Sequence, residues 1–383
     1  MNVAFPVNTR IYRIAVSVFF FIAGFTFSTW ASRIPDIKDK LHLSEAGLGT
    51  VLFALPVGQI ISLPLSGWLT ARFGSRKIMI AAALLYPLTL LTLAIAGSIW
   101  QLAFSLFLFG LWANLINIAM NTQAVEVETL YGRSIMASFH GLWSLAGFSG
   151  AAIGSFFVSS GLSPLVHFSI ICVVTSMLVL FFFNNTLPSE SNNKSSGPLF
   201  VKPDPRILTL GLIAFCCMLC EGAMADWSGV YFQKIVKTPA AITTLGYVAF
   251  MATMATGRFL GDWLITKFGV KPMLQLSGIL IASGLLVVVL FPFLIAATIG
   301  FLMVGFGVSC VVPMVYGLAG KSTTMSPGMA LTAVSTISFL GFLIGPPLIG
   351  LIAQASNLRW SFAVIALLGL GTTLLAGKIK EEK

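Results

Sequence analysis

Residues 68–76 read Trp-Leu-Thr-Ala-Arg-Phe-Gly-Ser-Arg, and residues 263–271 repeat this pattern as Trp-Leu-Ile-Thr-Lys-Phe-Gly-Val-Lys. Each copy follows one long apolar stretch and precedes another. Further upstream, Leu48-Gly49 has its counterpart in Leu245-Gly246 at nearly the same offset. The chain therefore consists of two related halves.

Long apolar stretches fill both halves. There are about a dozen of them, each about 20 residues long, which is the length of a helix that crosses the hydrocarbon core of a bilayer. Hydrophobic residues make up 57% of the chain and charged residues only 9%. Lipid offers no partner to exposed backbone groups, so only helices fit these stretches. We predict an all-α membrane protein with 12 transmembrane helices.

The predicted helices can be placed by residue number. They cover 11–33, 45–70, 77–97, 101–127, 134–160, 164–184, 206–232, 242–266, 272–292, 294–319, 328–354 and 359–378. The first stretch lacks a small-residue cleavage site and is followed by further spans, so it is interpreted as a helix and not as a signal peptide.

The net charge of +10 is spread unevenly over the predicted loops. Most Arg and Lys residues fall on one side of the membrane, among them Arg72, Arg76 and Lys77. By the positive-inside rule this side is cytoplasmic, and it also holds both termini. The basic charge therefore reflects membrane topology and does not indicate a nucleic-acid partner.

One long polar stretch interrupts the apolar pattern. Residues 185–205 are dominated by Ser, Asn, Pro and Gly, a composition typical of linkers. We predict an N-terminal six-helix bundle at 1–184, a cytoplasmic linker at 185–205 and a C-terminal six-helix bundle at 206–383. Parallel six-helix repeats of this kind are typical of secondary transporters.

Residues 67–77 resemble the signature between helices two and three of the major facilitator superfamily, with Ala71 where the family pattern has Asp. Sugar permeases of the fucose–proton symporter type are similar in lacking this acid. Residues 29–35, 117–121, 140–145 and 221–227 resemble that branch and its little-characterised bacterial relatives. The resemblance implies the major facilitator fold, with two pseudo-symmetric bundles in the bacterial inner (plasma) membrane. It also implies a functional Glu at the position that Asn117 holds here.

Amide side chains follow one face of the predicted helix 101–127. Asn114, Asn117 and Asn121 share this face, and the first two lie close to the membrane midplane. Amides both donate to and accept from hydroxyl groups, so this stripe suits a sugar or a polyol. The alternative is hydrogen bonding between neighbouring helices.

Four more residues complete the expected substrate site. Gln59 lies near mid-depth, Trp30 lies in the first helix, and Tyr247 lies in the eighth. Trp143 could offer its ring to the apolar face of a sugar. Packing against other helices is the alternative for each aromatic side chain.

Glu221 is the acid placed deepest in any predicted span, which makes it the first candidate for proton coupling. The alternative is a neutral Glu that bonds to a neighbouring helix. His140, near the cytoplasmic side, is the second candidate, because an imidazole can exchange protons near neutral pH. Asp226 is expected at an outer gate.

The remaining charged residues near the helix ends are gating candidates. They are Arg33 at the outer mouth and Arg72, Arg76, Glu126, Glu128, Arg258 and Asp262 toward the cytoplasm. Arg258 and Asp262 are spaced for an ion pair within one helix. Glu126 and Glu128 could pair with Arg133 or Arg72.

No cofactor or metal site is expected. Cys216 and Cys220 share a helix face, but no His or carboxylate completes a ligand set there, so packing is the preferred interpretation. The chain has no Walker loop, no HExxH motif and no GxSxG elbow, which argues against an enzyme.

The sequence therefore predicts a secondary transporter that imports a small hydroxylated solute, best a sugar, by proton symport. One alternative is a proton-driven exporter of an amphipathic compound, and another is a receptor or scaffold with the transporter fold. The expected partners are a small-molecule substrate, protons and the lipid bilayer, and we expect a monomer.

Overall fold

The computed structural model describes residues 9–131, 135–188, 204–320, 322, 325 and 327–379. In the first half the helices are α1 (Thr9–Ala31), α2 (Ile34–Lys40), α3 (Glu45–Leu52), α4 (Ala54–Phe73), α5 (Ser75–Ile95), α6 (Ile99–Tyr131), α7 (Met136–Ser159), α8 (Pro164–Phe182) and the short η1 (Phe183–Asn185). In the second half they are α9 (Pro205–Tyr231), η2 (Phe232–Val236), η3 (Ala240–Ile242), α10 (Leu245–Phe268), α11 (Val270–Leu290), α12 (Leu294–Ser309), α13 (Val311–Ala319), α14 (Pro327–Ala355) and α15 (Leu358–Gly377).

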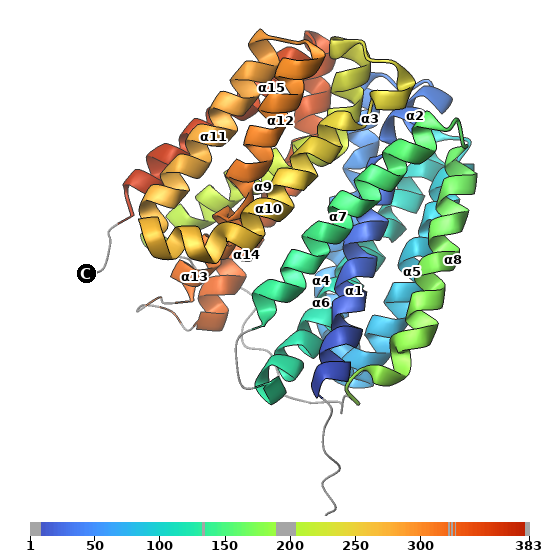
Figure 1. Cartoon of the computed structure of the whole chain (residues 1–383), viewed down its shortest axis with the longest axis vertical. Helices are drawn as coiled ribbons and strands as arrows, with labels where there is room; N and C mark the ends of the chain where they lie inside the picture. Colours follow the sequence, from blue (N-terminus) through green and yellow to red (C-terminus); the bar gives the residue numbers. More distant parts are fainter. Residues whose placement is uncertain are drawn as a thin grey trace, which may run out of the picture.

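The described residues contain 12 helical stretches long and apolar enough to cross a membrane, which confirms the predicted fold class. Figure 1 shows the helices of the first half, blue to green, beside those of the second half, yellow to red. Most of the linker predicted at 185–205, namely residues 189–203, lies outside the described residues.

Two of the predicted spans are each broken into two helices. The stretch 45–70 divides at Phe53, three residues before Pro56, and the stretch 294–319 divides at Cys310, three residues before Pro313. A proline lacks the backbone donor for the carbonyl four residues earlier and clashes with it, so the helix is interrupted there. Pro346 and Pro347, by contrast, both lie inside the continuous helix α14.

The repeated motif forms the same local structure twice. Gly74 ends α4 with a φ of 86°, and Gly269 ends α10 with a φ of 83°, a backbone region that glycine adopts at little cost. Arg72 lies over the Trp68 ring at 5.1 Å, and Lys267 lies over Trp263 at 5.0 Å. Local chemistry alone thus accounts for the similarity of the two copies.

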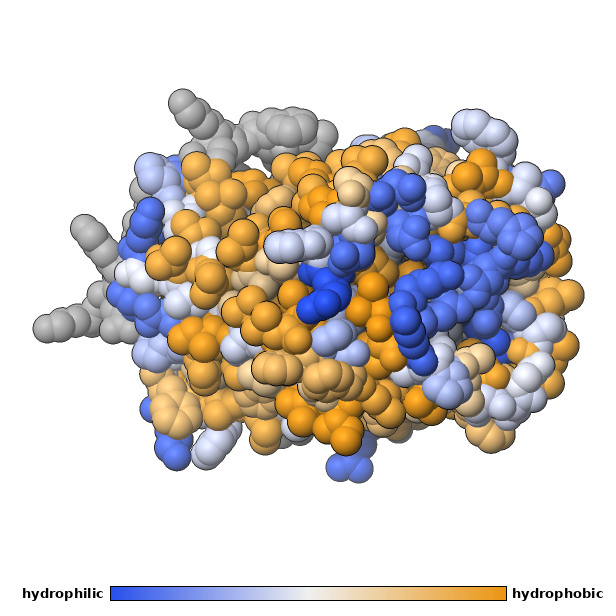
Figure 2. Space-filling view, turned by 90° about the horizontal axis from the view of Figure 1, so that it is seen from above, coloured by the Kyte–Doolittle hydropathy of each residue, from blue (hydrophilic) through white to orange (hydrophobic). Residues whose placement is uncertain are grey.

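Most contacts between the halves gather toward one end of the molecule. We call the end that carries α2 the outer end and the opposite end the inner end. Near the outer end α3 packs on α14, where Gly49 meets the carbonyl of Pro346 and the backbone of Gly350. Gln233 there donates to Asp39 across the halves. Figure 2 views this end and shows hydrophilic side chains gathered toward the first half, with apolar side chains over much of the remaining surface.

A second interface joins α7 to α10. The Ser28 and Tyr247 hydroxyls lie 2.9 Å apart beside it, and Gly147 receives the tip of Met251. Nearer the inner end, Gly141 meets the ring of Phe259. Glycine at these two positions of α7 leaves space for the Met251 and Phe259 side chains of α10.

Candidate functional site

A carboxyl group and a guanidinium lie close together in the interior of the second half. Glu221 lies a little past the middle of α9, and Arg258 lies a little past the middle of α10. The Arg258 Nη2 and Glu221 Oε1 atoms are 3.9 Å apart, and the two side chains are only 16% and 14% exposed. Charged groups at this depth are costly unless they are paired, so the contact stabilises both.

Arg258 also reaches the other half of the molecule. Its Nη1 donates to the Ser144 hydroxyl of α7 at 2.7 Å, and its guanidinium lies 5.6 Å from the centre of the Trp143 ring. Its Nε donates to the Ser309 carbonyl at the end of α12, at 3.4 Å. One side chain therefore joins α9, α7 and α12. We call Glu221, Arg258, Ser144 and Trp143 the central cluster.

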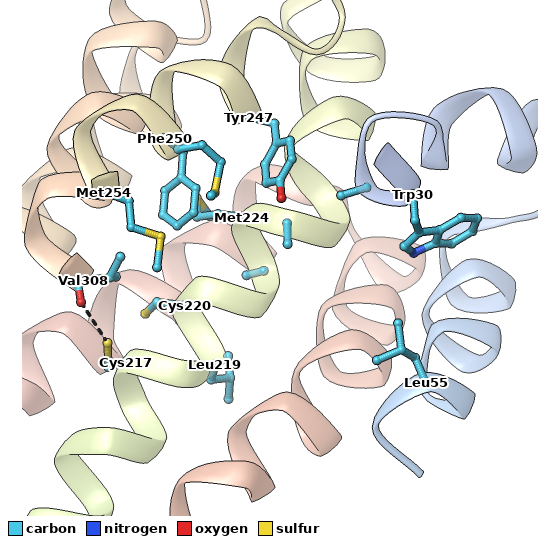
Figure 3. Close-up of a cluster of buried hydrophobic side chains, with 14 of the residues drawn as sticks. Trp30, Leu55, Cys217, Leu219, Cys220, Met224, Tyr247, Phe250, Met254 and Val308 are labelled. Carbon is cyan, nitrogen blue, oxygen red and sulfur yellow. Dashed lines mark hydrogen bonds between the residues drawn. The ribbon is translucent and has the colours of Figure 1, made fainter. Parts of the chain in front are cut away.

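Helix α10 presents Arg258 to α7 through its spacing. Tyr247, Met251, Met254 and Arg258 follow steps of four, three and four, which places them on one face. Figure 3 shows Tyr247 and Met254 of this face beside Phe250, and Cys217 directed at the Val308 carbonyl. Arg258 thus follows three buried side chains, Tyr247, Met251 and Met254, on one face of α10.

His140 lies one turn before Ser144 on α7. The Ser144 hydroxyl donates to the His140 backbone carbonyl at 3.1 Å, and the imidazole meets the Phe20 ring edge-on at 5.3 Å. The His140 side chain is exposed, whereas Glu221 is enclosed. The Ser144 hydroxyl therefore links the His140 backbone carbonyl to the Arg258 guanidinium, which in turn contacts Glu221.

Three residues expected to line the substrate site are packed between helices. Asn114 is 3% exposed and donates to the Ser62 and Ser66 hydroxyls of α4, so it ties α4 to α6. Trp30 is 1% exposed and packs on the Phe109 ring. Tyr247 is 2% exposed and bonded to Ser28. For these three, the packing alternative describes the structure.

The other substrate candidates keep accessible surface. Asn117 and Asn121 are partly buried on α6, where Asn121 Nδ2 donates to the Asn117 Oδ1 at 2.9 Å. Gln59 is partly buried on α4, and Trp143 is partly buried in the central cluster. The structure therefore brings Glu221, Arg258 and Trp143 together, while the two amides pair with each other on α6.

At the outer end, Arg33 is enclosed and bonded. It is 2% exposed, contacts Asp36 at 2.6 Å, and donates to His167 Nδ1 at 3.1 Å and to the Leu162 carbonyl at 2.8 Å. These bonds tie the end of α1 to α8 and to the loop before it. Asp226 lies partly buried near the outer end of α9.

At the inner end, four of the gating candidates have local partners, namely Arg72, Arg76, Glu126 and Glu128. Arg72 lies against Trp68 and Phe73, and Arg76 donates to the Phe183 carbonyl at 3.0 Å.

Nearby, Glu126 accepts from Gln123. Glu128 accepts from the backbone of Ile135 and Met136, so it caps α7. Arg133 and the side chain of Asp262 lie outside the described part of the chain, and with them the ion pairs predicted for these residues.

Sequence reasoning did not assign a site role to Ser144, Ser28 or Ser309. Ser144 entered only as part of residues 140–145, which carry the family resemblance. Its signal was a hydroxyl between Gly141 and Gly147, at the point where two helices approach closely. A small polar residue among glycines in a span indicates a helix contact.

Within the described residues, no three His, Cys, Asp or Glu side chains come together as a metal site. The five cysteines are buried, and none of them forms a disulfide in the described part of the chain. Cys217 contacts the Val308 carbonyl at 3.7 Å, and Cys220 contacts the Ile365 carbonyl at 4.0 Å. These contacts agree with the packing interpretation of the cysteines.

Two packed halves around a polar cluster inside the membrane define a polytopic transporter. The family model of the Major Facilitator Superfamily matches residues 16–327 and 243–382. The chain belongs to this superfamily, whose members are secondary transporters and not enzymes.

Two bacterial relatives match nearly the whole chain. An uncharacterised transporter of this superfamily from Yersinia pestis is 35% identical and covers 93% of this chain and 92% of its own. An uncharacterised transporter from Sinorhizobium fredii is 32% identical and covers 96% and 97%. The protein is thus a multi-pass membrane protein with bacterial homologues.

Solved structures share the fold. A nucleoside transporter variant has a TM-score of 0.78 at 12% identity and covers 96% of this chain and 99% of its own. A D-xylose–proton symporter has a TM-score of 0.77 at 14% identity, with coverage of 96% and 97%. FucP, in the outward conformation, has a TM-score of 0.66 at 16% identity, with coverage of 96% and 98%.

Proposed function

We propose that this transporter imports a small hydroxylated solute together with a proton, across the bacterial inner membrane. The observation that carries the proposal is the contact between Glu221 and Arg258 deep in the second half, with Arg258 also bonded to the first half. Residues 1–184 and 206–383 would move as two bodies about this contact.

The central cluster can couple protonation to movement. A proton that reaches Glu221 neutralises its carboxylate and removes the ionic partner of Arg258. Because Arg258 also bonds to Ser144, a change in its pairing alters how α7 packs on α10. The exposed side chain of His140, one turn from Ser144 on α7, is the second residue that we propose for accepting the proton from the inner end.

The contacts gathered near the outer end support an inward-facing conformation, given the predicted cytoplasmic position of the inner end. Opening the outer end would separate α3 from α14 and Asp39 from Gln233. Access then alternates between the two sides around the central cluster.

For the substrate, we infer a sugar or a related polyol. Asn117 and Asn121 offer amides, Gln59 offers a third, and Trp143 offers a ring. A D-xylose–proton symporter shares the fold, and an arabinose–proton symporter from Bacillus subtilis is 26% identical over 126 residues.

Export of an amphipathic compound is the second candidate. A protein named Multidrug resistance protein 2, from Bacillus subtilis, is 24% identical over 375 residues and covers 91% of this chain. Its match is far longer than that of the arabinose symporter, which covers 33% of this chain. The apolar surroundings of the central cluster suit such a compound as well.

One experiment separates the two candidates. Proteoliposomes that contain the purified protein are challenged with a panel of sugars, polyols and sugar acids, and then with amphipathic cations, at two pH values. An inward proton current evoked by a sugar or polyol supports symport. A proton current evoked only by amphipathic compounds identifies an exporter and refutes the sugar proposal.

A further inference from the structure

A cavity of about 620 Å³ lies at the inner end, and no residue of the central cluster is among those that line it. Its walls come from the start of α1, the end of α6 and the first turns of α7. Arg10, Arg13 and Tyr131 give it a polar mouth, and Ile14, Val18 and Phe21 give it an apolar wall.

The polar mouth is positively charged, and Tyr131 holds one of its two guanidinium groups in place. Arg13 donates to the Tyr131 hydroxyl at 3.3 Å, and its guanidinium lies 5.2 Å from the centre of the Tyr131 ring. These contacts hold the guanidinium in place while leaving other donors available. Among the described residues that line the cavity, none is acidic, so it attracts anions.

The apolar wall continues from the mouth along α1. Ile14, Val18 and Phe21 follow steps of four and three, so they share one face of the helix. Ile14 is 53% exposed, although its helix is one of the membrane spans. An exposed apolar side chain in a span finds its natural partner in a lipid chain.

We propose that this cavity binds an anionic phospholipid of the cytoplasmic leaflet. The headgroup phosphate accepts from Arg10 and Arg13, and the acyl chain lies along Ile14, Val18 and Phe21. Basic pockets between helices on the cytoplasmic side attract anionic headgroups. A small soluble anion would contact the arginines but not the apolar wall.

The test measures lipid affinity of the full chain in detergent by native mass spectrometry. Phosphatidylglycerol is titrated against the parent protein and against the double variant Arg10→Gln/Arg13→Gln. We expect the double variant to bind this lipid about thirtyfold more weakly, because each of the two basic residues adds to headgroup attraction. Phosphatidylethanolamine should bind both proteins weakly and equally.

The matched control is Lys77→Gln/Lys271→Gln, which removes two positive charges from the same side but outside the cavity. Equal loss in this control would show general charge attraction and overturn the proposal. Unchanged binding of the Arg double variant would overturn it as well. Competition by inorganic phosphate at equal concentration would identify a site for small anions in place of a lipid. The elution profile of each variant establishes that it is folded.

Discussion

Arg258 connects three helices inside the membrane through one side chain. It contacts the Glu221 carboxylate, the Ser144 hydroxyl and the Ser309 carbonyl, which belong to three different helices. Removing one partner of such a pair leaves an uncompensated charge in the interior. The loss of stability caused by this lone charge exceeds the net stabilisation that the intact ion pair provides.

The first prediction concerns the proton. Glu221→Gln keeps the shape of the side chain but cannot exchange a proton, so proton-driven uptake should fall to background while substrate exchange continues. Uptake and counterflow in proteoliposomes measure the two activities. Glu45→Gln, an acid near the outer end that pairs with Lys38 at 3.4 Å, is the control and should retain both. Proton-driven uptake by the Glu221→Gln variant would refute the coupling role.

The second prediction concerns the pair itself. Arg258→Met leaves Glu221 without its ionic partner and should destabilise the protein by about 3–5 kcal/mol. Adding Glu221→Gln removes the lone charge, so the double variant should be more stable than Arg258→Met alone. Thermal unfolding of the four proteins measures this coupling. Strictly additive effects would show that the two side chains do not interact.

Some helices of this protein approach each other closely at glycines, because glycine has no side chain to keep the backbones apart. A Cβ atom on Gly49 would lie 2.5 Å from the Pro346 carbonyl oxygen, closer than any real contact. A Cβ atom on Gly67, in α4, would have nothing within 4 Å. The contact between α3 and α14 therefore depends on glycine, whereas this position of α4 does not.

The third prediction compares these two positions. Gly49→Ala should destabilise the conformation closed at the outer end by about 1–3 kcal/mol, because the backbone must shift to admit the methyl group. Gly67→Ala is the matched control and should leave stability unchanged or slightly raised. Thermal unfolding measures both. Equal effects of the two substitutions would contradict the close packing of α3 on α14.

At the scale of the whole molecule, transport requires the outer contacts to open and close. Asp39 and Gln233 are bonded across the halves. Ser28 and Tyr247 form a second such contact at 2.9 Å. Both must separate if the outer end is to open, so each reports on the conformation of the whole chain.

The fourth prediction concerns a disulfide that would hold the outer end closed. A disulfide between Asp39→Cys and Gln233→Cys should stop nearly all uptake, and a reductant should restore it. The natural cysteines are buried and therefore interfere little. Each single cysteine variant, treated with the same oxidant, is the control and should remain active. Full transport by the cross-linked protein would exclude opening at this place.

The number of membrane-spanning stretches and their helical structure could be predicted from the amino-acid sequence. Length and hydrophobicity are local properties, and lipid permits only helices in stretches of this kind. The repeat of 68–76 at 263–271 likewise indicated two related halves, and the same glycine turn ends both copies because a turn depends on neighbouring residues. Glu221 could also be selected from the sequence, because an acid in a span is costly wherever it points.

Which polar side chains meet could be learned only from the folded chain. Ser144 and Arg258 are 114 residues apart, and no local pattern predicts that they bond. The same holds for Asn114, whose face looked suited to a cavity but whose amide joins Ser62 and Ser66. The rotation of each helix about its axis depends on close packing against all of its neighbours. That packing is a property of the assembled bundle and not of any one segment.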